Sequence, residues 1–235
     1  MIDAVRREMA AAANPEKAAG MQAYMKSAMP FYGLKLPDVR SISRRVFDQS
    51  PPATCDNWRA TILELWRGAQ YREERYAALE LLSRKEHRGC LTPDAMPMLE
   101  EMVVTGAWWD LVDELAHVIG DLLRDHPKPM RTLMRKWGRD PNLWKRRISI
   151  ICQLGFKRET DLDLLYANIE SNLADREFFI RKAIGWALRQ YAWTEPDEVA
   201  RYVHEHEAEL SGLSRREALK NISPLPAGER ARQRG

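Results

Sequence analysis

The stretch "GAWWDLVDELAHVIG" at residues 106–120 places an aromatic ring and a carboxylate where they could act together. Trp109 and Asp113 are four residues apart, so on a helix both side chains point toward the same face. Aromatic faces attract cations, and a carboxylate stabilises nearby positive charge. The pair would therefore suit a site that binds a cation. The ordinary alternative is a packed ring with the acid at its rim.

Asp113 by itself has three interpretations. It could be a solvated acid that pairs along its helix with His117. It could ligate a metal, but His204 and His206 are two residues apart and would lie on different helix faces. It could also act catalytically, beside a ring and in a groove with basic flanks. The residues leave these alternatives open.

Helices are predicted almost throughout the chain, which indicates an all-α fold. Asn14 is a plausible N-cap, followed by Pro15 at the first helical position. Ser214 and Glu217 have the spacing of a capping box. Turn signals such as "LTPDA", "GRDPN" and "TEPDE" divide the chain into short helical segments.

A weak repeat runs through these helices. Segments 71–82, 143–154 and 178–189 share a layout of aromatic, charged and then aliphatic residues, with anchors at Arg75, Arg147 and Lys182. The anchors recur at about 36 residues, and the missing step falls at position 111. This period, with two helices per unit, favours a helical repeat array of the HEAT or TPR kind. We expect its concave groove to gather Trp109, Asp113, Arg147, Lys182 and Trp186.

Composition and cysteine usage limit the class of protein. With 45% hydrophobic and 30% charged residues, the 235-residue chain is globular. We expect one domain over residues 1–225 and a disordered basic tail over 226–235. Cys55, Cys90 and Cys152 lie far apart without a CxxC pair, which disfavours a zinc site. Their odd count, without a disulfide framework, favours a reducing compartment. Without a signal-peptide pattern or a long apolar run, we expect a cytoplasmic protein.

The net charge of +3 says little about partners, but basic residues cluster. Arg44–Arg45 and 145–147 are examples. Each cluster alone is usually a solvated helix face. Trp109 and Trp186 are likewise more often core residues than ligand walls.

The motifs "WWDLVDELAHVIGDLL", "DPNLWKRRISIICQL" and "EFFIRKAIGWALRQYA" together resemble the AlkD-like DNA alkylation repair family of HEAT-like-repeat DNA glycosylases. The resemblance covers about residues 10–222. It implies a right-handed superhelical array of HEAT-like antiparallel helix pairs with a concave DNA-binding groove, in a protein of the bacterial cytoplasm that associates with the nucleoid. It also implies a monofunctional glycosylase that excises 3-methyladenine and 7-methylguanine from duplex DNA in base excision repair. It also implies a monomer that needs no metal or cofactor.

The resemblance assigns roles to individual residues. Asp113 matches the catalytic carboxylate, and Trp109 and Trp186 match aromatic residues around the lesion. The residues expected to contact DNA are Arg147, Tyr24, Lys35, Lys182, Arg189 and Lys157. Leu36 and Gly155 depart from the family pattern at two expected backbone contacts, and Lys35 is expected to compensate for the first.

Two other functions are open at this point. The chain could be a non-catalytic HEAT-like protein that recognises distorted or branched DNA. It could also be a protein-binding scaffold, which would predict an apolar or acidic groove, and the basic anchors at 147 and 182 disfavour it.

Overall fold

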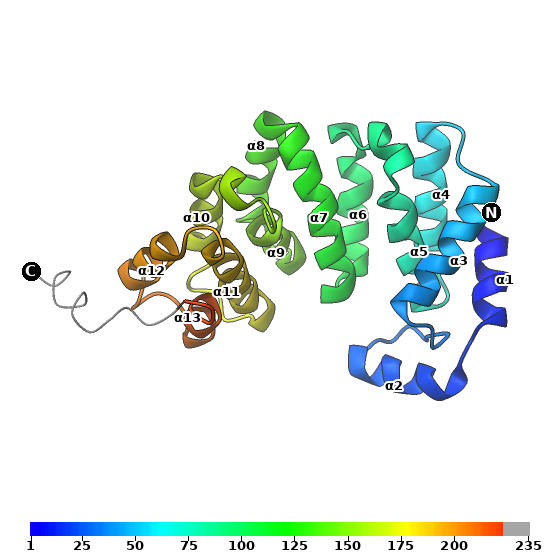
Figure 1. Cartoon of the computed structure of the whole chain (residues 1–235), viewed down its shortest axis with the longest axis horizontal. Coiled ribbons are helices and arrows are strands. Elements are labelled where there is room, and N and C mark those ends of the chain that lie inside the picture. Colours follow the sequence, from blue (N-terminus) through cyan, green and yellow to red (C-terminus); the bar gives the residue numbers. More distant parts are fainter. Residues whose placement is uncertain (223–235) are drawn as a thin grey trace, which may run out of the picture. The chain divides into compact units, whose positions relative to one another are not determined.

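The structure is a computed structural model that describes residues 1–222 (Figure 1). The described residues form α-helices and short 3-10 helices and contain no strand, which confirms the all-α prediction. The described residues divide into two compact units, one over Met1–Val118 and a second that begins at Ile119. The expected single domain, superhelix and concave groove stay predictions, and the expected tail at 226–235 lies outside the described residues.

The first unit contains the helices up to the first half of α7. They are α1 (Ile2–Ala11), α2 (Pro15–Met25), α3 (Leu36–Gln49), α4 (Cys55–Arg67), α5 (Arg72–Leu82), η1 (Lys85–Cys90), η2 (Pro93–Ala95), α6 (Met96–Gly106) and α7 (Trp109–Asp125). The second unit starts within α7. It continues with α8 (Pro127–Trp137), α9 (Leu143–Ile151), η3 (Lys157–Glu159), α10 (Leu162–Glu170), α11 (Phe178–Ala192), α12 (Pro196–Glu205) and α13 (Gly212–Ala218).

The sequence repeat corresponds to alternate helices. The four anchor positions 75, 111, 147 and 182 lie near the starts of α5, α7, α9 and α11, with α6, α8 and α10 between them. Each repeat is therefore one helix pair, as the period predicts. No helix of the described residues is long and apolar enough to cross a membrane.

Side-chain caps explain several helix starts. The Asn14 side chain accepts a hydrogen bond from the Lys17 backbone N–H, and Pro15 opens α2, as predicted. The capping box predicted at Ser214 is wrong, because the N-cap of α13 is Ser211, whose hydroxyl accepts from the Ser214 N–H. Glu217 instead forms ion pairs with two cations of α11, as described below.

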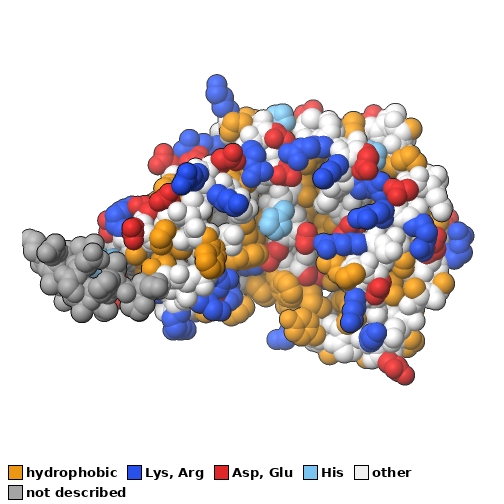
Figure 2. Space-filling model, in the orientation of Figure 1, with side chains coloured by type: hydrophobic (Ala, Val, Ile, Leu, Met, Phe, Trp, Pro, Cys, Tyr) orange, Lys and Arg blue, Asp and Glu red, His pale blue; other side chains and the backbone are white. Residues whose placement is uncertain are grey.

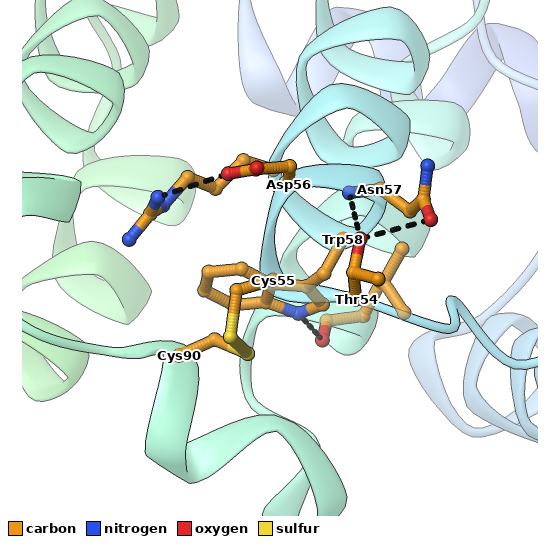
Figure 3. The surroundings of a disulfide bond; sticks show 8 residues. Thr54, Cys55, Asp56, Asn57, Trp58 and Cys90 are labelled. Carbon is orange, nitrogen blue, oxygen red and sulfur yellow. Dashed lines mark hydrogen bonds and ion pairs between the residues drawn. A yellow bond between two sulfur atoms is a disulfide. The ribbon is translucent and has the colours of Figure 1, made fainter.

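Cys55 and Cys90 form a disulfide, which corrects the expectation that the odd count of cysteines includes no disulfide framework and removes that argument for a reducing compartment (Figure 3). Their sequence separation is 35 residues, close to one repeat. One step along a helical array brings the start of α4 next to the end of η1, with a Cα–Cα distance of 5.2 Å. The ring of Trp58 lies beside the bridge and donates from Nε1 to the Leu81 carbonyl at 3.1 Å (Figure 3). Cys152 is a buried free thiol, and burial raises its pKa to about 12.

Candidate functional site

The turn between α6 and α7 determines where α7, the helix that carries Trp109 and Asp113, begins. Ala107 ends α6 in the left-handed region with φ 36°. A Cβ atom at Gly106 would lie 2.9 Å from the Trp66 ring, so glycine allows this close approach. The carbonyl of Trp108 then accepts the first helical hydrogen bonds of α7, from the N–H groups of Leu111 and Val112.

The first half of α7 has a buried and a partly exposed side. Leu111, Val112 and Leu115 are fully buried. Trp109 and Asp113 are each partly exposed. The ring and the carboxylate therefore share the side of the helix that the core does not cover, as their spacing predicts. Asp113 is therefore in part accessible to solvent.

Asp110, the residue after Trp109, is anchored to α5. Its carboxylate accepts from Arg72 Nε at 3.0 Å, from Arg72 Nη2, and from the Tyr76 hydroxyl at 2.6 Å. The side chains of Arg72 and Asp110 are only 6% and 10% exposed. Burial and the neighbouring Asp110 carboxylate raise the pKa of the Tyr76 phenol. Local sequence patterns do not reveal this cluster, because Arg72 and Asp110 are 38 residues apart.

In the second unit, Arg147 and Trp186 lie together. Arg147 is buried, donates from Nη1 to the Phe179 carbonyl at 2.7 Å, and has its guanidinium 5.9 Å from the ring centroids of both Phe179 and Trp186. Such distances allow cation–π attraction. Trp186 itself is partly exposed. Phe179 is a contributor that the sequence analysis missed, although it lies one turn before Lys182 in α11.

Lys182 and Arg189, both expected at DNA, share one carboxylate. Lys182 Nζ lies 3.0 Å from Glu217 Oε1, and Arg189 pairs with Glu217 Oε2. A Cβ atom at Gly185 would come within 2.5 Å of the Glu217 Cβ, so α13 packs closely on this face of α11. The hydrogen bond from Lys182 is the main cause of a lowered pKa at Glu217. The cluster carries two positive charges and one negative charge.

The other expected DNA contacts lie on the surface of their units. Tyr24 in α2 is 76% exposed. Lys35 is the exposed N-cap of α3. Lys157, with φ 55°, is exposed and lines an open cavity of about 410 Å³ beside Trp193, whose side chain is 70% exposed.

A buried carboxylate holds the loop that leads to Lys35. Glu73 of α5 is fully buried and accepts from the backbone N–H groups of Tyr32, Gly33 and Leu34 at 2.9–3.1 Å. Gly33 has φ 86°, which favours glycine. The loop that joins the exposed α2 to Lys35 is thereby tied to the core of the first unit.

Charge is mixed on the face drawn in Figure 2, where Lys and Arg side chains alternate with Asp and Glu side chains. Many arginines pair with acids from a neighbouring repeat, for example Arg67 with Glu101 and Arg146 with Asp175. A basic cluster in the sequence is therefore not by itself a DNA-binding surface. Trp109 and Asp113 lie in the first unit, and Arg147, Lys182 and Trp186 in the second; their convergence in one groove stays a prediction.

Comparison with known proteins gives the family. The sequence profile described as DNA alkylation repair enzyme matches residues 5–222. The chain belongs to the DNA alkylation repair enzyme family. A solved structure described as a predicted DNA alkylation repair enzyme from Enterococcus faecalis is 31% identical, with a TM-score of 0.81, and the match covers 90% of this chain and 97% of that one. No curated protein matches the chain. As a member of this family the chain has a role in DNA alkylation repair, which confirms the resemblance drawn from the motifs.

Proposed function

We propose that this alkylation repair protein is a monofunctional DNA glycosylase that releases cationic N-alkylated purines, such as 3-methyladenine and 7-methylguanine, from duplex DNA. The observation that carries the proposal is the partly exposed Trp109–Asp113 pair on α7, a helix whose opposite face is fully buried. Membership in the alkylation repair family over residues 5–222 supports it.

The substrate's own chemistry explains why one carboxylate is enough. Alkylation at N3 or N7 places a positive charge on the purine, so the base leaves with the bonding electrons of the C1′–N bond and becomes neutral. The sugar becomes an oxocarbenium-like cation. Asp113 stabilises this charge and accepts a proton from the water that attacks C1′. A second carboxylate to protonate the leaving group is not needed, unlike in most glycoside hydrolases.

The aromatic residues and arginine bind and orient the nucleotide in this proposal. Trp109 and Trp186 present ring faces to the cationic base and sugar, each contributing roughly 0.5–2 kcal/mol. Arg147, which is buried and bonded to the Phe179 carbonyl, orients the Trp186 ring and adds positive charge near a phosphate. Tyr24, Lys35 and further basic residues contact the DNA backbone without reading its sequence. The protein acts as a monomer and uses no cofactor.

The choice of lesion tests the proposal. Duplexes that carry either a cationic lesion (7-methylguanine or 3-methyladenine) or a neutral one (uracil) are incubated with excess protein, and free base is measured by chromatography. We expect release of the cationic bases and retention of uracil, because uracil is not activated as a leaving group. Binding without release of any base would support the non-catalytic DNA-binding alternative instead. Equal release of uracil would contradict the assigned mechanism.

A further inference from the structure

The α6–α7 turn is held from both sides by one helix, α5. On the α6 side, Arg75 Nη1 donates to the Thr105 carbonyl at 3.0 Å while its guanidinium lies 4.9 Å from the Trp66 ring centroid. On the α7 side, Arg72 and Tyr76 bind Asp110. Arg72, Arg75 and Tyr76 have the i, i+3, i+4 spacing of one helix face. Both ends of the α6–α7 connection are therefore attached to the same helix.

Asp110 links α5 to the part of α7 that carries Trp109 and Asp113. It is the second residue of α7, adjacent to Trp109 and three residues before Asp113. Its two carboxylate oxygens receive three donors, two of them from the planar fork of Arg72. Bidentate contact to a guanidinium fixes the direction as well as the distance of a carboxylate. The first turn of α7 therefore has a fixed rotation about its own axis.

We infer that the buried cluster of Arg72, Tyr76 and Asp110 positions Trp109 and Asp113 for base release. This inference rests on the proposed glycosylase function. The three residues do not touch the substrate; they are positioning residues that act through the first turn of α7. Removing one of them leaves Asp113 chemically intact and shifts where its carboxylate points. A displacement of about 1 Å at a catalytic group can cost about 100-fold in rate.

The test uses Tyr76→Phe, which deletes one hydrogen bond, and Asp110→Asn, which removes the charge that faces Arg72. Single-turnover release of 7-methylguanine is measured at saturating protein, beside the Kd for the same duplex. We expect the rate to fall about 10-fold in Tyr76→Phe and about 100-fold in Asp110→Asn. We expect Kd to change less than 2-fold, because the backbone contacts remain.

A second cluster of the same type supplies the matched control. Tyr166 donates to Glu198 at 2.8 Å, and Arg201 Nε donates to the other Glu198 oxygen at 2.9 Å, all within the second unit. Tyr166→Phe removes the same hydroxyl from the same kind of cluster, remote from α7 in sequence. We expect it to leave the release rate unchanged.

Amide hydrogen exchange separates positioning from general destabilisation and from failure of the proposed function. The inference predicts faster exchange in Tyr76→Phe at residues 107–113, with unchanged exchange in α3 and α4, whether or not the wild type releases base. Faster exchange with an inactive wild type would confirm the anchor and refute the glycosylase proposal. Any of three results would overturn the inference. These are unchanged exchange, release rates within 2-fold of wild type in both variants, or a fall in rate that is matched by a rise in Kd.

Discussion

The Cys55–Cys90 disulfide gives a stability prediction whose size follows from the chain. It closes a loop of 35 residues that runs from the start of α4 through α5 to the end of η1. A cross-link lowers the conformational entropy of the unfolded chain, and a loop of this length corresponds to about 4 kcal/mol at 25 °C. We expect Cys55→Ser to lower the free energy of unfolding of the first unit by up to about that amount. For a unit of 118 residues the loss is a Tm decrease of roughly 15 °C.

The assay is urea unfolding of the wild type and Cys55→Ser, each with and without a thiol reductant. The reductant should bring the wild type to the midpoint of the variant and leave the variant unchanged, which makes the variant its own control. Exchange protection should fall over residues 54–91, around Trp58, while the second unit stays unaffected. Identical midpoints for oxidised and reduced wild type would refute the reasoning, because an unformed or thermodynamically neutral bridge adds no stability.

Three further predictions follow from single residues. Gly33→Ala should lower the free energy of unfolding by about 2–4 kcal/mol, measured by urea unfolding. Gly33 has φ 86°, and the added Cβ would lie 2.1 Å from the Asn14 carbonyl oxygen. A stability equal to wild type would show that the loop does not depend on glycine. Glu217→Gln should release Lys182 and Arg189 and steepen the salt dependence of DNA binding by about one ion, measured as log Kd against log salt; an unchanged slope would place both cations away from phosphate. The pKa of Glu217 is lowered from 4.5 in the folded state, so its ion pairs stabilise the fold at neutral pH and are lost as pH falls below that value. Thermal melts from pH 7 to pH 3 should therefore show a smaller acid-induced decrease of Tm in Glu217→Gln than in wild type. Equal decreases of Tm in the two proteins would contradict the assignment.

Much of the fold was predictable from local signals. The Asn14–Pro15 helix start and the alternation of helix pairs at the repeat period agree with the structure. The spacing of Trp109 and Asp113 correctly predicted that they share one side of α7, and the structure shows this side to be partly exposed. These features depend on neighbours within one or two helical turns, which a single sequence displays.

The features that the sequence analysis missed depend on contacts between repeats. Cys55 and Cys90 are one repeat apart, so the same period that predicted the helix pairs could have predicted the bridge. Arg72 and Asp110 are separated by 38 residues and have the same relation. The local spacing of Ser214 and Glu217 predicts a helix cap, whereas the partners of Glu217 lie on α11. Pairing charged residues at one repeat period would have found these contacts.

The measurement that tests the central claim most directly compares Asp113→Asn with Glu114→Gln in single-turnover release of 7-methylguanine from duplex DNA. Both variants remove one carboxylate charge from adjacent positions of α7, but Glu114 is exposed and does not lie on the side of Trp109. We predict at least about a 100-fold loss of rate for Asp113→Asn with Kd retained, and a rate within 2-fold of wild type for Glu114→Gln. Full base release by Asp113→Asn would contradict the assignment of this carboxylate as the catalytic group.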